Sequence, residues 1–274
     1  LCAQTGYVDD KLFDIIGADE TKAIAQYEMA LIPPIPSDAV VHDIACGLGP
    51  VTESILATGA RPREIIATDL APPMTSLYNN VAEAHSWPSR ATVMDCQKLH
   101  FPDGHFTHNF LSFGLPIIAD PTKAASELYR TLQPGGTCVT AFWLQIPQGE
   151  NAQETRAAIW GPDAHLAMEP RPRHKDRDYL RELLVGAGFK FEDVELHEKS
   201  AFLPVKDLHE FARAIWSAIG QPRGGWTQED EERWDEAVDK YKELLQQKRG
   251  FHVGTGGKVT LEAIAQVAIV KKRA

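Results

Sequence analysis

Three short apolar runs in the first part of the chain each end at or beside an aspartate, namely Asp43, Asp69 and Asp95. Runs of this length and composition are typical of buried parallel strands. Because parallel strands bring their carboxyl ends to one edge of a sheet, we expect the three carboxylates to line one crevice. Carboxylates bind cationic groups and hydroxyl groups, so the ligand of this crevice should carry such groups.

A glycine-bearing loop follows the first of these aspartates. Gly47 and Gly49 let the backbone turn tightly and let a ligand approach it without an intervening side chain. The third glycine of the dinucleotide pattern G-x-G-x-x-G would fall at Thr52, and a carboxylate at position 43 would repel a pyrophosphate. Both features disfavour NAD and favour S-adenosylmethionine, whose amino-acid part carries an ammonium group.

The second and third acids have the spacing of nucleoside ligands. Asp69 lies about 20 residues beyond the loop, where a βαβ unit places the acid that accepts the ribose hydroxyls. Asp95 follows the third run and is expected to accept the adenine amino group. Met74, in the helix that Pro72 and Pro73 open, either covers the adenine or fills the core, and the sequence leaves both interpretations open.

These motifs, with Leu132-Gln133-Pro134-Gly135-Gly136 before a further strand, resemble the class I S-adenosylmethionine-dependent methyltransferases. His105-Phe106-Thr107-His108 and Phe113-Gly114 are similar to small fungal secondary-metabolite methyltransferases of the gliotoxin thiol methyltransferase type. Ala45 replaces the usual first glycine of the family, whereas Gly47, the residue nearest the cofactor in the family, is kept. Residues and resemblance together predict the following cofactor-binding residues: Asp43, Ala45, Cys46, Gly47, Gly49, Asp69, Leu70, Met74, Asp95, Cys96 and Ser112.

The resemblance implies an α/β, Rossmann-like fold. We expect a seven-stranded, mostly parallel sheet with an antiparallel last strand, helices on both faces, and a helical lid from the N-terminus and the insertions. The 274 residues are predicted to form a single domain. Its parts are an N-terminal cover (1–38), a cofactor-binding core (39–146), lid insertions (147–180 and 201–257) and the last strand (258–274).

Several element boundaries follow from local signals. Asp120 before Pro121 predicts a helix start, and Thr227 with Asp230 forms a capping-box pattern at the start of another helix that runs through Leu245. A helix is also expected over 179–187, with a sixth strand over 189–197 after it.

Aromatic residues without an accompanying basic cluster indicate a small, mainly apolar methyl acceptor. The candidates for its binding site are Tyr27, Phe113, Trp143, Trp160 and Trp216, of which at least half of the tryptophans are expected to serve only packing. Methyl transfer depends chiefly on orientation, and a thiol acceptor needs no base, because its pKa of about 8.5 supplies some thiolate. If a base exists, His165 and His174 are the candidates; otherwise the catalytic residue is unknown.

The histidines and cysteines offer two further kinds of site, which we do not favour. A metal would need His100, His105, His108 and Cys96 together, but strand residues three apart face opposite sides, so we expect none. The four cysteines show no paired spacing, which favours a reducing, cytoplasmic location over secretion and small apolar packing over nucleophilic chemistry.

Composition narrows the classes of partner. A net charge of −10 and a pI near 5.5 disfavour nucleic-acid binding, which needs clustered Lys and Arg. No run of eighteen apolar residues occurs, so no membrane partner is expected, and oligomeric state is not indicated. Two alternatives stay open: a regulator that binds S-adenosylmethionine without turnover, and a cyclase that uses the sulfonium charge.

Overall fold

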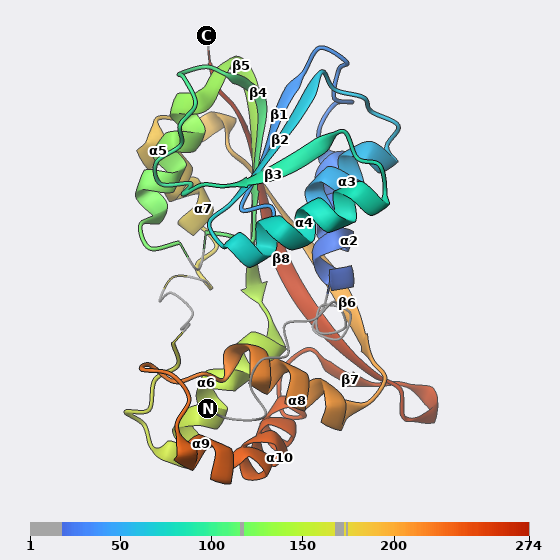
Figure 1. Ribbon diagram of the computed structural model, residues 1–274, viewed down its shortest axis with the longest axis vertical. Helices are drawn as coiled ribbons and strands as arrows, with labels where there is room; N and C mark the ends of the chain where they lie inside the picture. The colour runs from blue at the N-terminus through green and yellow to red at the C-terminus, as the bar shows by residue number, and fades with distance from the viewer. Residues whose placement is uncertain (1–17, 116–117, 168–172, 174, 274) are drawn as a thin grey trace. The chain divides into compact units, whose positions relative to one another are not determined.

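The computed structural model describes residues 18–115, 118–167, 173 and 175–273 (Figure 1). Contacts divide the chain into two compact units. One, here called the sheet unit, comprises Thr21–Leu144, Arg173–Lys199 and Ala265–Ala274. The other, here called the helical unit, comprises Leu1–Glu20, Gln145–Pro172 and Ser200–Ile264. The predicted division into cover, core and lid insertions stays a prediction.

Among the described residues, eight strands form one sheet in the order β3-β2-β1-β4-β5-β8-β6, with β7 paired to β8. The first five strands are parallel to one another. The strand order reverses between β1 and β4, which is where open α/β sheets form their ligand crevice. The strands are β1 Val40–Ile44, β2 Glu64–Asp69, β3 Ser89–Val93, β4 Phe106–Ser112, β5 Leu132–Gln145, β6 Glu195–Val205, β7 Phe251–Val253 and β8 Val259–Lys271.

The last strand is antiparallel, as predicted. The Gly135 amide donates to the Lys272 carbonyl, and the Lys272 amide donates to the Gly136 carbonyl, so the start of β5 pairs with the end of β8. In the sheet unit, α5 and α7 lie on one side of the strands and α3 and α4 on the other (Figure 1). The Rossmann-like α/β fold class is confirmed, with β7 as an unpredicted eighth strand.

The helices of the sheet unit begin where the sequence supplies start signals. The Asp120 side chain accepts from the Lys123 amide at 3.1 Å and Pro121 is the first helical residue, which confirms the predicted cap of α5. The predicted strand over 189–197 was placed too early, since β6 begins at Glu195 after a short 3₁₀ turn, Phe191–Asp193. The helices are α2 Ala18–Leu31, α3 Pro50–Ala57, α4 Pro72–Ala84, α5 Pro121–Thr131 and α7 Tyr179–Ala187.

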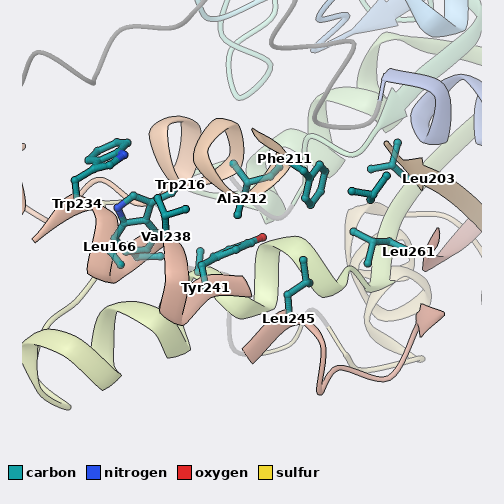
Figure 2. Close-up of a cluster of buried hydrophobic side chains, with 14 residues drawn as sticks. Leu166, Leu203, Phe211, Ala212, Trp216, Trp234, Val238, Tyr241, Leu245 and Leu261 are labelled. Atoms are coloured by element: carbon teal, nitrogen blue, oxygen red, sulfur yellow. The ribbon is translucent and has the colours of Figure 1, made fainter. Parts of the chain in front are cut away.

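The helical unit has its own core, in which Trp216, Trp234 and Tyr241 are almost completely buried (Figure 2). The capping box at the start of α9 is present as predicted. The single helix expected from there to Leu245 is instead two, because the chain leaves helical geometry at Arg233. The helices are α6 Pro147–Trp160, α8 Leu208–Ile219, α9 Gln228–Glu232 and α10 Trp234–Leu245, with a 3₁₀ turn at Thr255–Gly257.

No helix within the described ranges is long and apolar enough to cross a membrane. Cys46, Cys96 and Cys138 are free thiols.

Candidate active site

The first predicted cofactor-binding residue, Asp43, is hydrogen-bonded by Thr52 of the same chain. It is 1% exposed near the end of β1, and its Oδ2 accepts from the Thr52 amide at 3.1 Å and from the Thr52 hydroxyl at 2.7 Å. Burial raises the pKa of Asp43 to about 7, and the nearby charge of Asp69 adds to this, while the bonds from Thr52 oppose it. The residue that replaces the third glycine therefore ties α3 to the tip of β1.

This bond continues through a buried chain of hydroxyl groups that the sequence did not reveal. The Tyr78 hydroxyl, on α4, donates to Thr52 Oγ1 at 2.9 Å and lies 2.7 Å from Ser89 Oγ at the start of β3. Every hydroxyl group in this chain is satisfied if Ser89 donates to Tyr78, Tyr78 donates to Thr52, and Thr52 donates to Asp43. Two strands of the parallel sheet, β1 and β3, are thus linked through α3 and α4 by one hydrogen-bonded network.

The loop after β1 adopts left-handed backbone geometry at alternate residues, with φ of 52° at Ala45, 52° at Gly47 and 84° at Gly49. A β-carbon at Gly49 would lie 2.6 Å from the Trp87 ring, so packing requires glycine there. Among the residues that the structure describes, none would lie within 4 Å of a β-carbon at Gly47. The backbone at Gly47 is consequently open to a ligand.

The second predicted ligand, Asp69, joins this loop directly. Its Oδ2 accepts from the Gly47 amide at 3.0 Å, and its Oδ1 accepts from the Ala71 amide at 2.9 Å. An ionised carboxylate has about four acceptor positions, so two remain for ribose hydroxyls. Leu70 is 63% exposed beside it, and Met74 is half-buried in the first turn of α4.

The third predicted ligand, Asp95, is half-buried and is oriented by Gln97. Its Oδ1 accepts from the Gln97 amide and from the Gln97 side-chain amide, both at 2.9 Å. The side-chain Oε1 of Gln97 in turn accepts from the Asp120 amide at the start of α5. Burial, followed by the charge of Asp95, raises the pKa of Cys96 to about 11, and burial raises that of Cys46 further, so both thiols are unreactive near neutral pH.

The tip of β4 contacts a buried acid that the sequence analysis missed. The Ser112 hydroxyl donates to Glu28 Oε1 at 2.7 Å, and Glu28, on α2, is 0% exposed. Burial raises the pKa of Glu28 to about 8, with the charge of Asp43 adding to this and the bond from Ser112 opposing it. The signal was present, since Ile24 and Glu28 lie one turn apart on α2 and share its buried face.

The aromatic candidates fall into separate groups. In the sheet unit, Phe113 stacks on Trp143 with ring centroids 4.3 Å apart, and Phe113 has a left-handed φ of 64°. Tyr27 lies in the same unit, with the Lys199 ammonium 5.4 Å from its ring centroid. In the helical unit, Trp160 and Trp216 stack at 6.1 Å, and Trp216 is 0% exposed in the core. The acceptor-binding role of all five stays a prediction.

The histidine candidates do not form a cluster in the part of the chain that the structure describes. His165 is exposed in the helical unit, and His174 lies outside the described residues. Among the described residues, no group of three or more His, Cys, Asp or Glu side chains is placed to hold a metal ion. His42, in the middle of β1, is buried against Phe106, and burial lowers its pKa to about 3, so it is neutral.

The residues at the carboxyl ends of β1 and β2, with Glu28 of α2, suit a ligand that carries both a cation and hydroxyl groups. Asp43 and Glu28 are buried acids, and burial, hydroxyl contacts and other carboxylates shift their pKa values. Among the described groups that shift these pKa values, none is a cation. Glu28 Oε2 is buried without a hydrogen-bond partner in the described part of the chain. Together with the open backbone at Gly47, this donor and acceptor set fits S-adenosylmethionine and opposes a pyrophosphate.

Comparisons with known proteins agree with this chemistry. Residues 42–140 match the family model described as "Methyltransferase domain". Methyltransferase tpcH of Aspergillus fumigatus is 24% identical over 243 residues, which cover 85% of this chain and 84% of that protein.

Two solved structures share the fold. A putative methyltransferase of Bacillus halodurans has a TM-score of 0.60 at 17% identity, covering 91% of this chain and 99% of that one. Phosphoethanolamine N-methyltransferase 2 of Haemonchus contortus, solved with phosphomonomethylethanolamine and S-adenosylhomocysteine, has a TM-score of 0.56 at 16% identity, covering 92% and 53%.

Proposed function

Because this chain is a class I S-adenosylmethionine-dependent methyltransferase, we propose that it methylates a small, largely apolar metabolite at a thiol, hydroxyl or amine. The observation that carries this proposal is the stacked pair of Phe113, which directly follows Ser112 at the tip of β4, and Trp143, which lies near the end of β5. Stacked, half-buried aromatic rings at this end of a parallel sheet favour a planar or apolar acceptor over a highly charged one.

The chain's own residues would bind and orient the reactants. In this proposal Asp69 holds the ribose hydroxyls, Asp95 the adenine amino group, and the open backbone at Gly47 lies against the amino-acid part. When bound, S-adenosylmethionine supplies an electrophilic methyl carbon on its sulfonium. The protein's contribution is then alignment, for which no catalytic base is needed if the acceptor is a thiol.

The cellular role is proposed on separate grounds. The resemblance to fungal secondary-metabolite methyltransferases and the match to an Aspergillus fumigatus methyltransferase support a role in secondary metabolism. Free Cys46, Cys96 and Cys138 support a cytoplasmic location, because a reducing compartment keeps thiols unpaired.

The experiment is to incubate the protein with methyl-labelled S-adenosylmethionine and a panel of dithiol, phenol and amine metabolites. We expect one apolar class to gain the label together with stoichiometric S-adenosylhomocysteine. Binding of the cofactor with no S-adenosylhomocysteine formed for any acceptor would contradict methyl transfer and favour the regulator or the cyclase.

A variant tests the acceptor site. Trp143→Leu removes the stacking partner of Phe113 and should raise the acceptor KM by about 2- to 10-fold, the range of one aromatic contact, while the cofactor Kd stays unchanged. Phe191→Leu, at an aromatic residue of the sheet unit that is 63% exposed, is the matched control and should leave both constants unchanged. Equal effects of the two substitutions would contradict the assignment.

A further inference from the structure

Glu28 is a buried acid with half of its hydrogen-bonding capacity unused. Its Oε1 accepts from Ser112, whereas Oε2 is shielded from water and has no partner among the described residues. Leaving a buried polar atom unpaired costs free energy, and buried polar groups in proteins are nearly always paired. A buried oxygen that the described residues leave unpaired can be satisfied by a bound group.

Glu28 lies beside the carboxyl ends of β1 and β4. It is held by Ser112, the last residue of β4, and its pKa responds to the charge of Asp43 on β1. β1 and β4 are hydrogen-bonded neighbours, with Asp43 opposite Phe110, and the strand order reverses between them. Glu28 therefore lies at the reversal point, where sheets of this type bind their ligands.

The charges around Glu28 favour a cationic ligand. The groups that shift its pKa are Ser112 and Asp43, and those that shift the pKa of Asp43 are Thr52 and Asp69. These come from β4, β1, α3 and β2, and none of them is a cation. Two buried acids beside a third carboxylate form a site of one sign, which a bound ammonium group would neutralise.

We propose that Glu28, oriented by Ser112, binds the ammonium group of the cofactor's amino-acid part through its unpaired Oε2. An ammonium carries three donors and can satisfy this oxygen, while a largely apolar acceptor offers no such group. The inference rests on the identity of the cofactor and not on the proposed acceptor, so either can fail without the other.

Calorimetry with two ligands tests this assignment. One is S-adenosylhomocysteine, and the other is its analogue that lacks only the amino group. Glu28→Gln should weaken S-adenosylhomocysteine binding about tenfold, the loss of one charge-assisted hydrogen bond, and should change the Kd of the deaminated analogue less than about twofold. Ser112→Ala should weaken S-adenosylhomocysteine binding less, because Glu28 remains but is no longer oriented.

Proton release provides a second readout. With a pKa of about 8, Glu28 is largely protonated at pH 7 and must ionise to pair with an ammonium. Titrations in buffers of different ionisation enthalpy should show that Glu28→Gln lowers the number of protons released on binding by about one. A merely structural role of Glu28 would leave this number unchanged.

Glu20 provides a matched control on the same helix. It is 2% exposed, burial raises its pKa to about 8, and its Oε2 accepts a hydrogen bond from Gln148. Its Oε1, like Oε2 of Glu28, is buried without a partner among the described residues, but Glu20 is not bonded to the end of β4. Glu20→Gln should leave the S-adenosylhomocysteine affinity unchanged. The proposal is overturned if Glu28→Gln leaves that affinity intact, if it weakens both ligands equally, or if it lowers only the rate with an acceptor present, which would make Glu28 a base.

Discussion

Thr52 is the residue whose replacement tests most directly how this site is built. Its hydroxyl donates to Asp43 at 2.7 Å and accepts from Tyr78 at 2.9 Å, and the side chain is 0% exposed. Thr52→Val keeps the shape but removes both bonds, whereas the Thr52 amide still donates to Asp43. Thr52→Ser keeps the hydroxyl and serves as the control.

The expected loss follows from the charge of the acceptor. A hydrogen bond to an ionised group contributes about 1.5 to 3 kcal/mol, and a neutral one about 1 kcal/mol. Tyr78 keeps its contact with Ser89, so its share is small. We expect Thr52→Val to lower the free energy of unfolding by about 2 to 4 kcal/mol at pH 8, where Asp43 is mostly ionised, and by about 1 kcal/mol at pH 5, where it is protonated.

Urea denaturation of the cofactor-free protein at pH 5 and pH 8 measures both values. Thr52→Ser should lose no more than about 1 kcal/mol at either pH, because only a methyl group is removed. A loss for Thr52→Val that is the same at both pH values would refute the reasoning, since the bond to an ionised carboxylate would then not be its source.

Three further predictions concern other residues. The pKa of Glu28 in the folded state, about 8, lies above its ordinary value of 4.5. At pH values between these two, the folded state binds more protons than the unfolded state. The stability of the cofactor-free protein should therefore fall as pH rises from 5 to 8. Glu28→Gln should make this slope, measured by urea denaturation, shallower by up to about 1.4 kcal/mol per pH unit, and an unchanged slope would contradict the shifted pKa. Asp69→Ala should weaken cofactor binding by about 1 to 3 kcal/mol, and unchanged affinity by calorimetry would contradict the ribose assignment. Asp230→Ala leaves the buried guanidinium of Arg156 without its ion-pair partner and should destabilise the protein by about 3 to 5 kcal/mol in thermal or urea unfolding, whereas a loss below about 1 kcal/mol would show that water replaces the carboxylate.

The parts of the fold that were predictable are those where local chemistry and tertiary packing agree. Asp120 and Thr227 cap their helices because each places a side-chain acceptor before a run of unpaired amides. β1, with Asp43 near its end, was equally clear, because it is buried along its whole length and strands buried on both faces form mainly apolar runs.

The misplaced elements show where that agreement breaks down. α6 was not expected, because its buried residues include Gln148, Asn151 and Thr155, so no apolar stripe marks the helix. β6 was placed too early because apolar Phe189 is buried directly after α7 rather than in a strand. The period-two burial of 201, 203 and 205 belongs to the true strand.

In the site, too, the sequence showed which residue types are present but not which hydrogen-bond partners they have. Position 52 was noticed only as a missing glycine, and its role as the holder of Asp43 depends on a hydrogen bond that no spacing predicts. Glu28 was visible as a polar residue on an apolar helix face, but its partner Ser112 lies 84 residues away in sequence. Contacts at such separations follow from the fold and not from a local pattern.

In the proposed arrangement, Asp43 and Glu28 would couple cofactor binding to proton release, and the residue that orients Glu28 adjoins the proposed acceptor site. Asp43 and Glu28 have pKa values near 7 and 8. Without a bound cation, these carboxylates bind protons near neutral pH, and the negative charge of the site is reduced. A bound ammonium would displace at least one of these protons, so affinity should rise with pH until the ligand's own amine loses its proton. Ser112, which orients Glu28, is followed directly by Phe113, which stacks on Trp143. The end of β4 therefore places the residues proposed to hold the cofactor's ammonium and the acceptor next to each other in the chain, and the left-handed φ of Phe113 turns the backbone at that step.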